Sequence, residues 1–282
     1  MKHLINMLLL AVVATGVLSA QTTSTDLDIP AQKAILKGTL LTPNPEKKLP
    51  TVIIVPGSGQ IKRSDIQGLV SAVFNGLEVA VLIYDKRGVG ESTGEYKPVN
   101  AKNSKRRIRA RAKDVLAIID VLAKHEMVDE KRIILMGSSQ GGWVVPLAAS
   151  QTDQVASIIC ISGAANSVGV SDHYDQMADD SESIEDALAA LDSYRGVQGF
   201  NPYLALTRLE VSGFWIYGGM DKSNPTQADI EVLNKIKEQE GKDFTIKLYE
   251  NCNHEMMDVR TGQLCNQLIP DLQSHLRQLT DQ

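Results

Sequence analysis

The sequence has few cysteines, and the ones it has are far apart. Cys160, Cys252 and Cys265 form no CxxC pair and no cysteine–histidine ligand spacing, so neither a zinc site nor a disulfide framework is predicted. We expect buried or partly buried free thiols. A bridge between Cys252 and Cys265 after export is the alternative.

Positive charge is not in excess either. The net charge of −5 gives no general basic face for a polyanion, so no nucleic-acid partner is expected and the substrate is predicted to be small. One basic run stands out, with seven lysines and arginines between Lys102 and Lys113. It is interpreted as a solvated face leading into a helix, and attraction of an anionic substrate is the alternative.

No apolar run reaches the roughly 20 residues that span a bilayer. The run from Leu4 to about Leu18 follows Lys2 and precedes small residues, which is the pattern of a secretory signal peptide. We therefore predict a signal peptide over residues 1–20 and one domain over 21–282, exported to the periplasm or the extracellular space. No stable membrane insertion is expected after cleavage, and an uncleaved anchor is the alternative. The sequence does not indicate an oligomeric state.

Apolar, β-branched runs alternate with helical patterns along the domain. Such runs are typical of strands buried on both faces of a parallel sheet, and they cover residues 51–57, 79–85, 132–137, 155–163, 211–219 and 244–250. An edge hairpin strand is predicted at 33–43, and helices at 112–125, 225–241 and 270–279. The alternation predicts an α/β fold with a doubly wound, mostly parallel sheet.

One segment breaks this alternation. From residue 166 the chain has no lysine or arginine until Arg195, and it interrupts the rhythm directly after a strand. We predict a short helical lid inserted at about residues 166–200.

The stretch MGSSQGG carries the first candidate for catalysis. Gly137, Ser139 and Gly141 fit GxSxG between a strand and a helix, a setting that exposes the central serine at the edge of the sheet. Ser139, rather than Ser138, is therefore the predicted nucleophile. A serine hydroxyl also needs a base, and the base needs an orienting group.

Both partners follow at the ends of later strands. Asp221 lies after the next-to-last predicted strand, and His254 lies after the last one. Alone, Asp221 could be an Asx-turn former and His254 a hydrogen-bonded loop side chain. Together, in the order serine, acid, histidine, they indicate a triad. Other carboxylates near His254 rank below Asp221 as its partner because they are close to it in sequence: Glu250, Glu255 and Asp258.

Acyl transfer also needs N–H donors for the developing oxyanion. The backbone N–H of Gln140, directly after the nucleophile, is the first prediction. The second is Ser58, in the glycine-rich loop PGSG after the first long strand. An ordinary tight turn is the alternative for this loop.

These features together resemble the α/β-hydrolase superfamily, and within it the secreted bacterial serine hydrolases that include acyl esterases and serine-aminopeptidase-like members. The resemblance runs from about residue 31 to the C-terminus and rests on PGSG (56–59), YDKRGVGES (84–92), MGSSQGG (136–142), YGGMDKSNP (217–225) and NH (253–254). It implies Ser139 as nucleophile, Asp221 as acid and His254 as base. Many relatives carry histidine where Pro56 stands, and the lid is short and acidic beside the caps of many lipases.

The functional hypothesis is a serine hydrolase that cleaves carboxylic esters of small or short-acyl substrates through an acyl-enzyme on Ser139. An aminopeptidase-like serine peptidase is the alternative, and the lid offers carboxylates for a substrate amine: Asp172, Asp175, Asp179 and Asp180. A catalytically silent binding protein is a distant alternative, because all three triad positions are filled. The chemistry requires no metal and no organic cofactor, and the expected partner is a small ester or a short peptide or amide.

Overall fold

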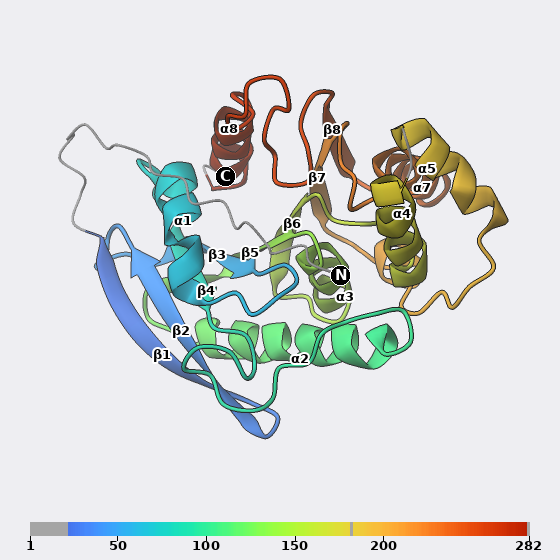
Figure 1. Ribbon diagram of the computed structural model, residues 1–282. Coiled ribbons are helices and arrows are strands. Elements are labelled where there is room, and N and C mark those ends of the chain that lie inside the picture. Colours follow the sequence, from blue (N-terminus) through green and yellow to red (C-terminus); the bar gives the residue numbers. More distant parts are fainter. Residues whose placement is uncertain (1–21, 181–182, 281–282) are drawn as a thin grey trace.

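The computed structural model describes residues 22–180 and 183–280, and its centre is an eight-stranded sheet (Figure 1). The strand order is β1-β2-β4-β3-β5-β6-β7-β8, in which β2 is antiparallel to both neighbours and all other pairs are parallel. This confirms the doubly wound, mostly parallel sheet. The strands are β1 Thr23–Ala31, β2 Ala34–Thr42, β3 Leu49–Val55, β4 Ala80–Tyr84, β5 Val128–Ser138, β6 Val155–Ile161, β7 Ser212–Gly218 and β8 Phe244–Tyr249.

Helices cover both faces of the sheet (Figure 1). Helices α1 (Gln67–Phe74) and α8 (Leu268–Thr280) pack on one face, and the other carries α2 (Ser104–Leu122), α3 (Gly141–Ala149) and α7 (Thr226–Glu240). Three further helices lie between β6 and β7: α4 Val168–Asp180, α5 Ile184–Ala190 and α6 Tyr203–Thr207. The predicted signal peptide lies outside the described residues. None of the helices in the described part of the chain is long and apolar enough to cross a membrane.

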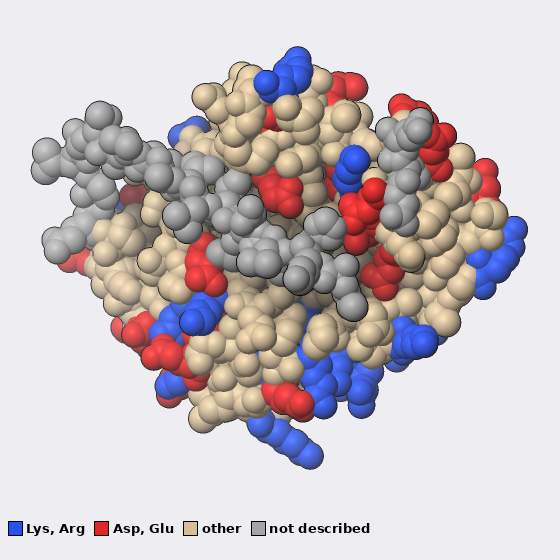
Figure 2. Space-filling view, in the orientation of Figure 1, with Lys and Arg blue, Asp and Glu red and all other residues tan. Residues whose placement is uncertain are grey.

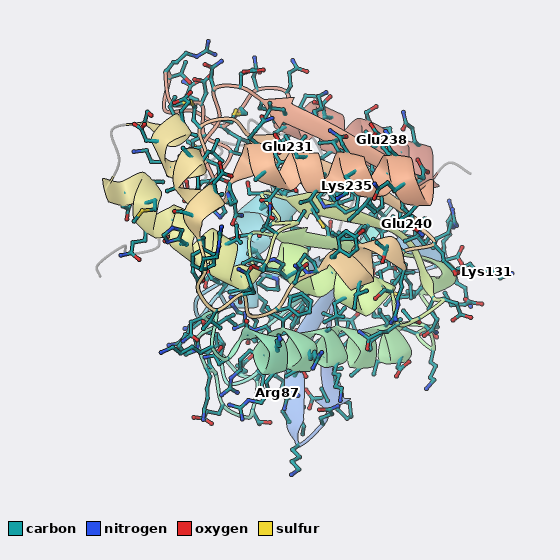
Figure 3. All side chains as sticks on the ribbon, turned by 90° about the vertical axis from the view of Figure 1, so that its right-hand side faces the viewer. Arg87, Lys131, Glu231, Lys235, Glu238 and Glu240 are labelled. Carbon is teal, nitrogen blue, oxygen red and sulfur yellow. A yellow bond between two sulfur atoms is a disulfide. The ribbon has the colours of Figure 1, made fainter. Side chains whose placement is uncertain are left out.

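The spacing of the buried side chains along each strand and helix explains these layers. Along β3 the side chains alternate between the two cores: Val52 and Ile54 face α1 and α8, while Ile53 and Val55 face α2 and α3. Helix α7 buries Leu233 and Ile236, and its outer face is charged, as Figure 3 shows for Glu231, Lys235, Glu238 and Glu240. The helix ends at Gly241, whose φ of +62° is the left-handed conformation common after a last turn.

The N-terminal hairpin differs from the prediction. The strand expected at 33–43 is β2, but it lies between β1 and β4, and the edge strand is β1, which was not predicted. The two strands meet at Gln32 and Lys33, with φ values of +31° and +61°. Asparagine and glycine are the usual residues in such two-residue turns, so this hairpin has no recognisable turn signature in the sequence. Arg87 secures the turn by donating to the carbonyl oxygens of Ala31 and Gln32 at 2.8 and 2.9 Å (Figure 3).

The segment predicted as a lid contains α4 and α5, which pack on each other through Tyr174, Ala178 and Ala187. It is tied to the rest of the domain at its beginning. There the carboxylate of Asp229, on α7, accepts hydrogen bonds from the backbone N–H groups of Ala165 and Asn166, both at 2.8 Å.

All recorded donors to Asp229 reach its Oδ1 atom, while the buried Oδ2 atom has no partner among the described residues. Burial raises the pKa of this carboxyl to about 7, against the opposing effect of the N–H donors. The native state therefore keeps a proton that the unfolded chain releases near pH 4. As the pH rises from about 4 to about 7, the free energy of unfolding falls by about 1.4 kcal/mol per pH unit.

Asp229→Asn should remove this pH dependence, because the amide oxygen can accept the same N–H bonds and carries no charge. We expect the wild type to lose roughly 2 kcal/mol more unfolding free energy than the variant between pH 5 and pH 7. Urea unfolding at both pH values measures the difference. Asp120→Asn, at an exposed position on α2, is the matched control and should follow the wild type. Equal pH slopes in the wild type and Asp229→Asn would contradict the prediction.

Candidate active site

The sheet brings three predicted residues to one edge. Strands β5 to β8 are parallel neighbours, so their carboxyl ends lie side by side, which is where open α/β sheets bind ligands. Ser139 follows β5, Asp221 follows β7 and His254 follows β8.

The turn after β5 holds Ser139 in a strained conformation. Its φ of +51° lies in the left-handed region, where a side chain other than glycine is unusual. Its N–H donates to Ile161 O at 2.9 Å, and its carbonyl accepts from Gly142 N at 2.8 Å, so both sides of the turn are fixed. Helix α3 starts at Gly141, where a Cβ would lie 2.5 Å from the carbonyl oxygen of Val55. Only glycine permits this close approach of helix and sheet, and the turn therefore projects the hydroxyl of Ser139 outward.

A continuous hydrogen-bonded chain links the three side chains. His254 Nε2 lies 2.9 Å from Ser139 Oγ, and His254 Nδ1 lies 2.8 Å from Asp221 Oδ2. The Asp221 side chain is fully buried, and its Oδ1 atom accepts from the backbone N–H groups of Ser223 and Asn224 at 2.7 and 2.8 Å. The structure thus brings together the serine, acid and histidine that the sequence selected.

The electrostatics of His254 are set by two opposing effects. Burial lowers its pKa, but the Asp221 carboxylate, the hydrogen bond to it and the charges of Glu255 and Asp175 raise the pKa above the ordinary value of 6.5. A histidine in this setting can take up a proton and hold it as imidazolium beside the buried carboxylate.

The loop after β3 lies against the turn that carries Ser139. A Cβ on Gly57 would be 3.3 Å from Ser139 Cβ. Lys86 Nζ donates to the carbonyl oxygens of Gly57, at 2.7 Å, and of Gly59. A trans peptide holds its C=O and the following N–H on opposite sides, so the Ser58 N–H points away from Lys86. The other predicted donor, the N–H of Gln140, stands at the N-terminus of α3, where helix N–H groups lack partners within the helix.

Sequence reasoning missed two side chains that support this site. Lys86 is buried, and burial followed by the positive charge of Arg111 lowers its pKa to about 7. Its only sequence signal is its position directly after a buried strand in YDKRGVGES. Tyr174, on α4, donates its hydroxyl to the carbonyl oxygen of Asp221 at 2.8 Å and so joins the lid to the triad. Nothing in the acidic lid sequence indicates that contact.

The cysteine prediction needs a correction. Cys252 and Cys265 form a disulfide, while Cys160 is free and buried. The sequence alone did not favour this pairing, because only the folded loop brings the two residues together. The loop between them contains His254 and is further braced by hydrogen bonds such as Cys265 N to Met256 O, at 2.8 Å.

Within residues 22–180 and 183–280, no group of three or more histidine, cysteine, aspartate or glutamate side chains is arranged to hold a metal ion.

The chain is similar to known hydrolases. Residues 67–269 match the model of the prolyl oligopeptidase family, and the chain belongs to this family of hydrolases in the α/β-hydrolase superfamily. An uncharacterised 31.7 kDa protein in the traX–finO intergenic region of Escherichia coli is 31% identical over 122 residues, which are 43% of this chain. The match spans 40% of the length of that relative.

Solved structures of similar fold include two hydrolases. An esterase of Pyrococcus furiosus has a TM-score of 0.66 at 16% identity, over 92% of this chain and 89% of its own. A dienelactone hydrolase of Anabaena variabilis has a TM-score of 0.59 at 15% identity, over 92% of this chain and 97% of its own. At these identities the likeness shows a shared fold.

Activity should depend on the neutral form of His254. Because the pKa of His254 is raised, kcat/KM for p-nitrophenyl acetate should fall as the pH drops through a midpoint above 6.5. NMR titration of the imidazole should give the same midpoint. In Asp221→Asn, where the carboxylate no longer raises it, the pKa of the imidazole should fall below its wild-type value. An unchanged titration in that variant would rule out Asp221 as the cause of the shift.

Reduction of the disulfide should loosen the loop that carries His254. A bridge across 13 residues stabilises by about 3 kcal/mol, so dithiothreitol should lower the free energy of unfolding by about that amount and reduce activity several-fold. The double variant Cys252→Ser/Cys265→Ser should show the same losses without reductant. Cys160→Ala, which leaves the bridge intact, should stay sensitive to reductant. Reductant sensitivity in the double variant would assign the effect to another site.

Proposed function

We propose that the protein is a serine hydrolase that cleaves carboxylic esters of small or short-acyl substrates through an acyl-enzyme on Ser139. The observation that carries this proposal is the chain of hydrogen bonds from Ser139 Oγ through His254 to the buried Asp221. A nucleophile, a base and an orienting acid at these distances are the parts that acyl transfer requires.

In the proposed mechanism His254 takes the proton of Ser139 as Oγ attacks the ester carbonyl. Asp221 holds the imidazole in place and stabilises the imidazolium. The N–H groups of Gln140 and Ser58 stabilise the oxyanion, and Lys86 supports this by fixing the carbonyls on either side of Ser58. His254 then protonates the leaving alcohol, and water, activated by the same histidine, hydrolyses the acyl-enzyme. The steps involve only groups of the chain and water.

An amide substrate is the second candidate, and two observations favour it. The family takes its name from an oligopeptidase. The lid also places acidic side chains near the triad. The charge of Asp175 contributes to the raised pKa of His254, and the same charge raises the pKa of Asp172. A substrate amine could bind there. Esters remain the proposal because their alcohol leaving group needs less assistance than an amine, and because an esterase and a dienelactone hydrolase share the fold.

We also propose that the protein is exported. The disulfide between Cys252 and Cys265 supports this, because disulfides persist in oxidising compartments and are rare in reducing ones. The predicted signal peptide over residues 1–20 would provide the route.

The proposal predicts turnover of p-nitrophenyl acetate and butyrate by the wild type and at least a thousand-fold loss of kcat in Ser139→Ala, because the nucleophile is removed. Ser138→Ala is the matched control, since Ser138 is the exposed neighbour outside the hydrogen-bonded chain, and it should keep most of the activity. Aminoacyl p-nitroanilides should be poor substrates. Parallel steady-state assays on both substrate series measure these differences.

A fluorophosphonate probe gives an independent readout of the nucleophile. It should label the wild type and Ser138→Ala but not Ser139→Ala. Labelling that survives Ser139→Ala would overturn the site, and turnover of anilides alone would replace the esterase with the peptidase.

A further inference from the structure

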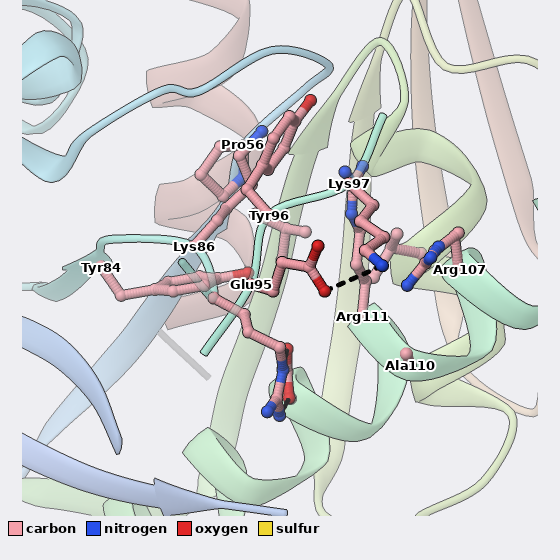
Figure 4. A pocket seen from close by; sticks show the side chains of 13 residues that line it. Pro56, Tyr84, Lys86, Glu95, Tyr96, Lys97, Arg107, Ala110 and Arg111 are labelled. Atoms are coloured by element: carbon pink, nitrogen blue, oxygen red, sulfur yellow. Dashed lines mark hydrogen bonds and ion pairs between the residues drawn. The ribbon is translucent and has the colours of Figure 1, made fainter. Parts of the chain in front are cut away.

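A pocket lies beside the Pro56–Gly59 loop, on the side of the sheet covered by α2 and α3. It is formed by the end of β3, the loop after β4 and the first turns of α2, and its free volume is about 50 Å³ (Figure 4). Five of the side chains that line it are basic: Lys86, Arg87, Lys97, Arg107 and Arg111. The basic run of the sequence therefore contributes to a concave surface as well as to a solvated one.

Two of these cations form ion pairs with acids that line the same pocket. Lys97 pairs with Glu95 at 2.8 Å, as Figure 4 shows, and Arg87 pairs with the buried Asp114. Lys86 is directed to the carbonyls of the Pro56–Gly59 loop. Positive charge thus remains in excess, because Lys86, Arg107 and Arg111 face no further carboxylate in the lining.

Arg107 and Arg111 are four residues apart on α2, so they lie on the same face of the helix. Each has a buried nitrogen without a hydrogen-bond partner in the described part of the chain, Nε of Arg107 and Nη1 of Arg111. Buried guanidinium nitrogens without partners are costly, and planar anions satisfy them well. Neighbouring positions 105, 106, 109 and 113 on the helix are also basic but exposed, which separates the inward pair from the solvated face.

The surroundings of Arg111 match an anion of small size. Its guanidinium lies over the ring of Tyr96, 5.6 Å from the centroid, and Lys86 Nζ lies 5.4 Å from the same centroid. Burial lowers the pKa of Arg111 and that of Lys86, and the charge of Arg111 lowers the pKa of Lys86 further, while the nearby Asp114 opposes the shift of Arg111. The free volume has room for a group such as a carboxylate.

We propose that this pocket binds a carboxylate carried by the substrate, through Arg107 and Arg111, while the ester carbonyl of the same molecule lies at Ser139. The pocket and the triad share the Pro56–Gly59 loop: Pro56 lines the pocket, and Gly57 packs against Ser139. This inference rests on the proposed esterase function and narrows its substrates to anionic esters. Figure 2 shows basic side chains gathered over α2 and acidic ones over α4 and α5, so an anionic group is attracted to the α2 side.

The test compares esters with and without a carboxylate. 4-Nitrophenyl hydrogen adipate carries a carboxylate on the acyl side, and 4-nitrophenyl adipamate is its neutral amide. A second pair, 3-carboxy-4-nitrophenyl acetate and 4-nitrophenyl acetate, places the charge on the leaving group. The wild type should prefer the charged member of one pair in kcat/KM by about 10- to 100-fold, the range for hydrogen bonds to a charged group.

In Arg107→Gln and Arg111→Gln this ratio should fall toward one. Arg109→Gln, at an exposed position on the same helix, is the matched control and should keep the wild-type ratio. The ratio is measured within each variant, so a partial loss of folded protein does not affect it. A wild type without preference in either pair, or a ratio that survives both arginine variants, would overturn the proposal.

Binding of free adipate to Ser139→Ala, measured by calorimetry, separates this proposal from the esterase function. Adipate should bind, and Arg111→Gln in the same background should weaken binding at least tenfold, while Arg109→Gln should not. If the wild type turns over no ester but adipate binds in this way, the esterase proposal is refuted and the anion-pocket proposal is retained. Equal binding by all three proteins would refute the pocket.

Discussion

The hydrogen bond between His254 Nδ1 and Asp221 Oδ2 fixes two side chains that the parallel sheet brings to one edge. It connects the loop after β8 to the loop after β7 at 2.8 Å, and through His254 Nε2 it reaches the turn after β5. The carboxylate is fully buried, so leaving it without this partner and its two backbone donors would be costly. Side chains therefore link the ends of three strands that the sheet already holds in place, and this arrangement places a histidine against a strained serine.

Several neighbouring interactions serve to keep this arrangement fixed. Ser162, at the end of β6, donates its hydroxyl to the carbonyl oxygen of His254 at 2.8 Å, and its own carbonyl accepts from the Asn224 side chain at 2.6 Å. The disulfide closes the His254 loop, and Tyr174 ties α4 to the backbone of Asp221. A site that depends on precise distances is thus supported by groups that do not take part in the proposed chemistry.

The sequence was sufficient to predict a feature wherever a local pattern of residues indicates it. The buried strands are continuous β-branched runs, and the positions of Ser139, Asp221 and His254 follow from the ends of those runs. The hairpin partner β1 was not predicted because its turn, Gln32–Lys33, lacks the usual residues. Lys86, the Cys252–Cys265 bridge and the inward direction of Arg107 and Arg111 depend on which loops meet in three dimensions, and no spacing along the chain encodes that. Local patterns thus predicted the three residues of the hydrogen-bonded chain better than the side chains that surround them.

The difference between the triad and the side chains around it affects how substrate selection could change in such a fold. The triad is fixed by the parallel register of the sheet, whereas the lid and α2 are attached to each other at the periphery: Ala101 N donates to Asp172 Oδ2 at 2.9 Å, and Phe200 N donates to Ser104 Oγ at 2.8 Å. Charge of opposite sign therefore lies on two connected elements, acidic on the lid and basic on α2 (Figure 2). Under the proposal, substitutions there would change which charged group is attracted without moving a strand end. The proposed chemistry and the proposed choice of substrate thus belong to different layers of the same molecule.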